Sequence, residues 1–142
     1  DANVGLGIAQ TMAGLSVDGV RTFEAGIKKW PSDAMHYQAY GVLLQRMAET
    51  GAAPETQAAA MFRKALELNP ALAESHYQLG QMAFSHGEID KSIEHFLAAL
   101  QNGEQGGKVH FALSRAYRRA GKPQEAEKHA GLFRKSNEDK LP

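Results

Sequence analysis

The feature that most constrains this chain is an internal repeat with a period of 34 residues. When the sequence is displaced against itself by that period, Leu79 falls on Leu113 and Gly87 falls on Gly121. A repeat of this length holds one helical hairpin, which cannot bury its apolar face without a neighbour. The chain is therefore expected to be all-α and to form its core by packing successive hairpins against one another.

The repeat divides the chain into four units, which are expected to form a single domain over residues 1–142. The units cover about residues 1–33, 34–72, 73–106 and 107–140. In the third unit, Ser92, Phe96 and Ala99 follow one another at intervals of four and three, so they share one face of a helix. Eight antiparallel helices in four hairpins are predicted, at about residues 2–13, 17–29, 33–47, 54–68, 71–85, 88–101, 107–119 and 123–136.

Two of the units depart from the regular pattern. The second has about five surplus residues, which fall in residues 49–57, where Gly51 and Pro54 interrupt the helical pattern. Repeat families place insertions in loops, so a lengthened turn is predicted there. The first unit has Gly19 and Gly26 at packing positions, as expected for an atypical terminal repeat.

The third unit resembles the tetratricopeptide repeat family. The family pattern has Leu-Gly and an aromatic residue, then Ala, Phe and Ala, and a closing Pro. Leu79-Gly80, Phe96 and Ala99 match it, whereas Ser92 replaces the first Ala and the closing Pro is missing. The resemblance implies an α-α superhelix, a solenoid in which the first helices of the hairpins line a concave side. Members of the family usually bind their partners on that side.

Small and large residues alternate between the two helices of each hairpin. Small residues are expected to let these two helices approach closely; they are Gly7, Gly41, Gly80 and Ser114. Large residues are expected to fill the space between hairpins; they are Phe23, Phe62 and Phe96. The fourth unit has Ala130 at the corresponding position, which predicts less filling there.

The resemblance places one stripe of each first helix on the concave side, where a partner would bind. The predicted partner-binding residues are Met35, Gln38, Val42, Gln45, Tyr77, Gln81, Phe84, Lys108, Phe111, Arg115 and Arg118. Glu74 belongs to the same stripe, and Arg119 lies at its edge. Arginine pairs with carboxylates through two hydrogen bonds, and aromatic and arginine side chains dominate many interfaces. We therefore expect a protein or peptide partner with an apolar segment and an acidic segment, the latter on Arg115 and Arg118.

Charge is unevenly distributed, which leaves two alternatives open. Residues 1–107 carry 7 Lys/Arg and 12 Asp/Glu, whereas residues 108–135 carry 8 and 2. The basic segment could contact nucleic-acid phosphates, but it is confined to one repeat, so nucleic acid is a less favoured partner. The other alternative is a structural spacer or self-assembly module of a larger protein, with homo-oligomers forming through the ends of the stack.

No motif for catalysis, metal binding or cofactor binding stands out. The chain has no cysteine, which fits the cytoplasm and the periplasm alike. Its six histidines include no His-x-x-x-His pair. His76 and His110 occupy equivalent positions, so we expect them about one helix spacing apart, which suits packing better than coordination. No apolar run reaches the length of a membrane span. We expect a binding protein that is not an enzyme and has no metal or cofactor.

Overall fold

A computed structural model describes residues 16–103 and 106–140, and all regular secondary structure in these ranges is α-helical. The helices are α2 (Ser16–Lys29), α3 (Ala34–Glu49), α4 (Glu55–Leu68), α5 (Ala73–Ser85), α6 (Ile89–Gln101), α7 (Gly107–Arg119) and α8 (Pro123–Glu138). Their ends agree with the predicted ends to within two residues, which confirms the all-α class. The predicted helix at about residues 2–13, with Gly7, lies outside the described residues.

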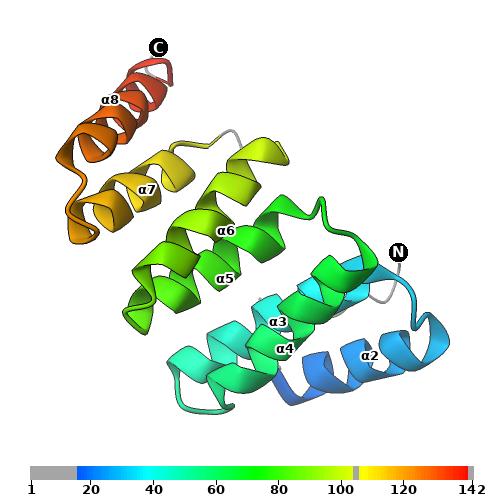
Figure 1. The fold of residues 1–142 in the computed structure, drawn as a ribbon. Coiled ribbons are helices and arrows are strands. Elements are labelled where there is room, and N and C mark those ends of the chain that lie inside the picture. Colours follow the sequence, from blue (N-terminus) through cyan, green and yellow to red (C-terminus); the bar gives the residue numbers. More distant parts are fainter. Residues whose placement is uncertain (1–15, 104–105, 141–142) are drawn as a thin grey trace. The chain divides into compact units, whose positions relative to one another are not determined.

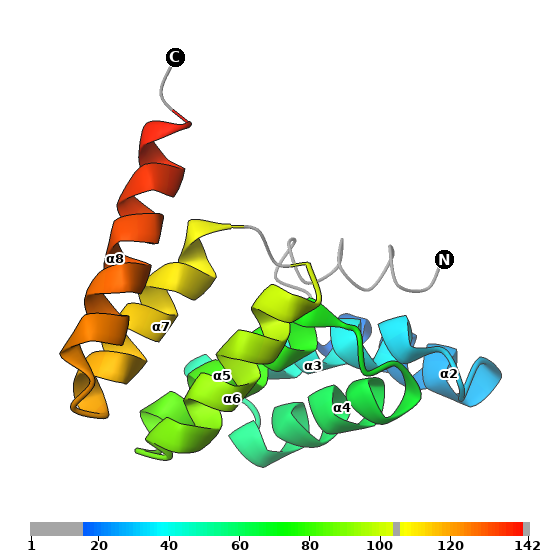
Figure 2. The ribbon, with the colours of Figure 1, turned by 45° about the horizontal axis from the view of Figure 1, so that its top comes forward.

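The chain comprises two compact units, Asp1–Ala71 and Leu72–Pro142. In the first unit, α3 and α4 form a hairpin and α2 packs against α3 (Figure 1). In the second unit, α5 and α6 form one hairpin, α7 and α8 form the next, and α7 packs against α6 and also contacts α5 (Figure 2). The second unit therefore consists of two stacked hairpins. That residues 1–142 form a single domain stays a prediction.

The ends of the first helices repeat with the same period as the sequence. Gly87 follows α5 with φ = 77°, and Gly121 follows α7 with φ = 75°, a conformation that glycine adopts without steric cost. After α5, the Glu88 amide donates to the Ala83 carbonyl at 2.9 Å and the Gly87 amide donates to the Phe84 carbonyl at 3.0 Å. This pair of hydrogen bonds is the Schellman motif, which ends a helix by satisfying its last carbonyl groups.

The surplus residues of the second repeat, which belongs to the first compact unit, lengthen both a helix and a turn. Helix α3 has 16 residues, whereas α5 and α7 have 13 each. The turn that follows α3 occupies residues 50–54, whereas the turn after α5 occupies residues 86–88. The prediction located the insertion but assigned all of it to the turn. Three of the five residues instead continue the helix, which runs to Glu49, two residues before Gly51.

In the two regular hairpins, a glycine of the first helix lies directly against a phenylalanine of the second. A Cβ atom on Gly80 would lie 2.6 Å from the Phe96 ring, and one on Gly41 would lie 2.8 Å from the Phe62 ring. Both rings are fully buried. The small residues thus permit the close approach that was predicted for them. The rings also pack inside their own hairpins, a role that was not predicted for them.

The core continues from one hairpin to the next in the second unit. Phe96 belongs to a buried cluster that also contains Val109, Leu113 and Ala116 of α7. Apolar contact of this kind is the main source of stability in stacked repeats, since a single hairpin cannot bury its apolar face alone. The same ring therefore closes its own hairpin and joins it to the following one.

The last hairpin has its large residue and its glycine at other positions than the preceding hairpin. Ser114 and Ala130 stand where the preceding hairpin has its glycine and its phenylalanine. Phe133, one turn further along α8, supplies the missing bulk and packs against Phe111 with ring centres 5.1 Å apart. Gly107 makes room for it, since a Cβ atom there would lie 3.1 Å from the Phe133 ring. The hairpin is therefore filled one turn away from the predicted position.

In the first unit, aromatic and polar contacts join α2 to α3. The Phe23 ring, which is fully buried, lies 5.8 Å from the Tyr40 ring. The Tyr40 hydroxyl donates to Glu24 Oε1 at 3.2 Å. Burial, with the Glu24 carboxylate beside it, raises the pKa of Tyr40 to about 12. Tyr40 therefore stays neutral at physiological pH and keeps this hydrogen bond.

Replacing Gly80 by alanine is expected to destabilise the protein by about 1–3 kcal/mol, because the new methyl group must displace a ring in a packed core. Gly131→Ala is the matched control within α8. The nearest atom to a Cβ there is Arg134 Nη2 at 3.7 Å, so space is available. Removing that helical glycine is expected to stabilise by about 0.5–1 kcal/mol. Urea unfolding followed by circular dichroism measures both, and equal effects of the two substitutions would contradict the packing argument.

Candidate functional site

Apart from Arg118, the predicted binding residues of the third and fourth repeats lie together on one face of the second compact unit. This α5/α7 face consists of Glu74, Tyr77, Gln81, Phe84, Lys108, Phe111, Arg115 and Arg119. Lys108 Nζ lies 2.9 Å from Glu74 Oε2 and 4.4 Å from the centre of the Tyr77 ring. Gln81 Nε2 donates to the Tyr77 hydroxyl at 2.9 Å. Residues that are 34 positions apart in the sequence thus become direct neighbours.

Two arginines of α7 lie over one ring of α5. The guanidinium carbon of Arg115 is 4.8 Å from the centre of the Phe84 ring, and that of Arg119 is 5.5 Å from it. Arg115 is also 5.7 Å from the centre of the Phe111 ring. The negative face of an aromatic ring attracts such cations. The rings therefore orient the two guanidinium groups, whose N–H donors can still bind an anion at the edge.

Arg118 does not share these ring contacts in the part of the chain that the structure describes. Arg119 follows Arg115 by four residues and so lies above it on the same side of α7. Arg118 precedes Arg119 by one residue, which rotates it by about 100° around the helix. The residue that was predicted at the edge of the stripe is therefore in contact with Phe84, and Arg118 is an exposed neighbour.

The face combines exposed apolar surface with positive charge. Phe111 is 45% exposed, which is unusual for so large an apolar side chain. Lys108 is partly neutralised by Glu74, and because both side chains are partly exposed their ion pair contributes little stability. The positive charge that remains for a partner therefore resides mainly on Arg115, Arg119 and Arg118.

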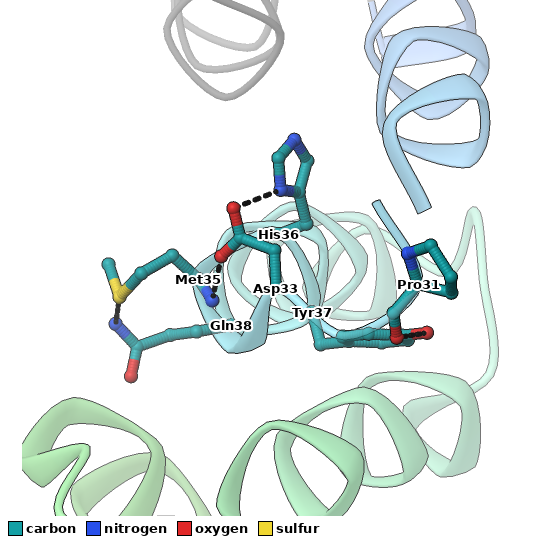
Figure 3. Close-up of polar contacts among 6 residues, drawn as sticks. All are labelled: Pro31, Asp33, Met35, His36, Tyr37 and Gln38. Carbon is teal, nitrogen blue, oxygen red and sulfur yellow. Dashed lines mark hydrogen bonds and ion pairs between the residues drawn. The ribbon is translucent and has the colours of Figure 1, made fainter. Parts of the chain in front are cut away.

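The predicted binding residues of the second unit of the repeat lie on α3. Met35 is 47% exposed, and Gln38 Nε2 donates to Met35 Sδ at 3.9 Å (Figure 3). Val42 and Gln45 are half-buried on the following turns. That these four side chains continue the surface formed by α5 and α7 stays a prediction.

His36, beside this stripe, has a structural role. Its side chain is fully buried, and His36 Nδ1 lies 3.0 Å from Asp33 Oδ2. The other carboxylate oxygen, Asp33 Oδ1, accepts a hydrogen bond from the Met35 amide at 3.0 Å and so caps α3 (Figure 3). The Trp30 ring stacks on the His36 ring with centres 5.4 Å apart. One aspartate therefore starts the helix and orients the buried imidazole.

Four other histidines pair within their hairpins. His76 Nδ1 lies 3.4 Å from His95 Nδ1, a contact between α5 and α6 that was not predicted. In the next hairpin, His110 Nδ1 lies 3.0 Å from His129 Nδ1. Both pairs are 19 residues apart in the sequence, a repeated spacing that could have revealed them. Within the described ranges, no group of three or more histidine, aspartate or glutamate residues could hold a metal ion.

Comparisons with known proteins agree with the fold. Residues 56–107 match the family model of the tetratricopeptide repeat. The search of curated proteins found no match. None of the helices within the described ranges is both long and apolar enough to cross a membrane.

Solved structures with the same fold include MamA and YrrB. A crystal structure of MamA aligns with a TM-score of 0.81 and 23% identity, over 97% of this chain and 78% of that one. YrrB, described as a TPR protein with an unusual peptide-binding site, aligns with a TM-score of 0.74 and 24% identity, over 83% of this chain and 58% of that one. The sequence repeat, the stacked hairpins and the solved structures together show that this chain has the tetratricopeptide repeat fold, and residues 56–107 also match the family model.

Proposed function

We propose that the chain is a protein-interaction scaffold that binds a segment of a partner protein on the α5/α7 face. The observation that carries the proposal is the exposed Phe111 ring next to two arginines oriented by Phe84. Aromatic and arginine side chains supply most of the binding energy at many interfaces. The tetratricopeptide fold and the peptide-binding site named for YrrB support the same class of function. The proposal assigns no catalytic role to the chain.

The chemistry of the face indicates what the partner segment would contain. An apolar side chain would be buried against Phe111 and the half-buried ring of Tyr77. A carboxylate would accept hydrogen bonds from Arg115 and Arg119, which the rings already hold in place, so little side-chain entropy is lost on binding. Arg118 would add a longer-range attraction. We therefore propose a segment in which an acidic residue lies near an aromatic or aliphatic residue.

The stripe on α3 is proposed as a contact surface of its own. Met35 offers a flexible, polarizable contact that adapts to differently shaped partners. Gln38 offers an amide group, Gln45 is half-buried with its amide oxygen inside the protein, and Val42 offers a small apolar surface. We propose Met35, Gln38, Val42 and Gln45 as contact residues of the first compact unit for a neutral segment of a partner.

A charge reversal tests the proposed carboxylate contact. A random peptide library displayed on phage and selected on the intact chain is expected to yield peptides with acidic residues beside apolar ones. Arg115→Glu should weaken the binding of a selected peptide by tenfold or more, which corresponds to about 1.4 kcal/mol. Arg118→Glu, the matched control on the same helix, should weaken it only by about threefold, a long-range charge effect that salt screens.

Fluorescence polarisation at low and high salt measures these affinities. Equal effects of the two reversals would contradict the assignment of Arg115, and selected peptides without acidic residues would contradict the proposed partner chemistry. The two alternatives from the sequence differ in outcome. Dimerisation that depends on concentration in sedimentation would favour self-assembly, and preferential retention of single-stranded RNA over the peptides would favour a nucleic-acid partner.

The ring beneath the arginines can be tested separately. Phe84→Leu keeps a large apolar side chain but removes the aromatic face, so binding of a selected acidic peptide is expected to fall by about threefold to tenfold. Because Phe84 would act through Arg115, the effects of Phe84→Leu and Arg115→Ala should be smaller in combination than their sum. Full additivity in this cycle would show that the ring does not orient the guanidinium group.

A further inference from the structure

Each hairpin of the second unit joins its two helices by a pair of histidines. His76 of α5 faces His95 of α6, and His110 of α7 faces His129 of α8. The pairs occupy equivalent positions of the repeat, 19 residues apart in each case. The pair in the last hairpin is the tighter one, with its two Nδ1 atoms 3.0 Å apart.

The geometry of the pairs identifies the type of contact. For His110 and His129 the ring centres are 5.3 Å apart against 3.0 Å between the nitrogens, and for His76 and His95 they are 5.7 Å against 3.4 Å. The difference is 2.3 Å in both pairs, about twice the distance from an imidazole centre to its nitrogen. The two Nδ1 atoms therefore point straight at each other. Two ligands of one metal ion would instead converge on a third point, which brings their ring centres closer together.

The surroundings of the last pair disfavour positive charge. His129 is 7% exposed, and the Tyr117 ring stacks on it with centres 5.6 Å apart. Burial, with Lys128 adding to it, lowers the pKa of His110. Burial, followed by His110 and then Lys128, lowers the pKa of His129. No carboxylate of α5, α6, α7 or α8 is paired with either imidazole in the described part of the chain.

We propose that His110 and His129 form an acid-sensitive clamp that joins α7 to α8 through one shared proton. In the neutral pair, one Nδ1 carries the proton and donates it to the lone pair of the other Nδ1. A first additional proton binds at Nε2 of the donor ring and leaves the Nδ1 hydrogen bond in place. A second additional proton must occupy the accepting Nδ1, so the hydrogen bond is lost and two positive rings face each other next to Lys128.

The direction of the pH dependence follows from proton linkage. An unfolded histidine has a pKa of about 6.5, and both folded values are lower, so the clamp contributes its full stability above pH ~6.5. As the pH falls below that value, the unfolded state binds protons that the folded hairpin excludes. The opening equilibrium of α8 from α7 therefore rises by up to about tenfold per pH unit for each excluded proton.

Nuclear magnetic resonance of the intact chain tests the clamp directly. At pH 7.5 a scalar coupling between the two Nδ1 nuclei of His110 and His129 is expected, because they share a hydrogen bond. In a titration toward pH 4.5, both rings should protonate below the pKa of about 6.5 of an unfolded histidine. Amide hydrogen exchange, corrected for its intrinsic pH dependence, should show that α8 loses protection below pH 6.5.

The hairpin of α3 and α4 supplies the residues for a matched variant. At the positions equivalent to His110 and His129 it has Tyr37 and Met61. The double variant His110→Tyr, His129→Met should retain α8 protection between pH 6.5 and 4.5. The control His86→Gln should lose protection as the original chain does. If the double variant does not fold, His129→Gln provides the same comparison, with the coupling absent and the pH dependence reduced.

Three results would overturn the proposal. The first is independent titration of His110 and His129 near pH 6.5 without a coupling between their nitrogens. The second is equal loss of α8 protection in the original chain and in the double variant. The third is a shift of both Nδ1 resonances on addition of Zn²⁺ at equimolar concentration, which would show that the pair is a metal site.

Discussion

The structure depends on the contact between a small residue of one helix and a ring of its partner. In the regular hairpins the glycine leaves no room for even a methyl group beneath the ring. Protein interiors are packed at the density of organic crystals, so such a contact fixes both the separation and the register of the two helices. Because Phe96 also joins the apolar cluster of the next hairpin, the same contact positions α7 relative to α6.

The candidate binding face follows from this packing. Once α6 holds both α5 and α7, the sides of the two first helices that do not face it form a shared surface. The aromatic residues on that surface hold cations of the neighbouring repeat, as Tyr77 holds Lys108 and Phe84 holds Arg115. Each repeat thus orients polar groups on the next one. Binding groups positioned by rigid helices lose little freedom when a partner arrives.

Much of the fold could be predicted from the sequence. Helix ends, apolar periodicity and the placement of small residues on one helix opposite large residues on the next are all local signals. The repeat also predicts which residues of neighbouring first helices lie side by side, as the contact of Lys108 with Tyr77 shows. The rest depends on side-chain direction. The contact of Arg119 with Phe84 and the pairing of His110 with His129 are set by helix rotation within a hairpin, which composition and spacing specify only to about one residue.

The most direct test of the central contact is a double-mutant cycle between Gly80→Ser and Phe96→Ala, the residues that the last hairpin has at these positions. Unfolding in urea gives the free energies of the four proteins. If the ring and the glycine fix the hairpin together, Gly80→Ser costs about 1–3 kcal/mol beside the phenylalanine and almost nothing beside the alanine. Equal costs in the two backgrounds would contradict this account.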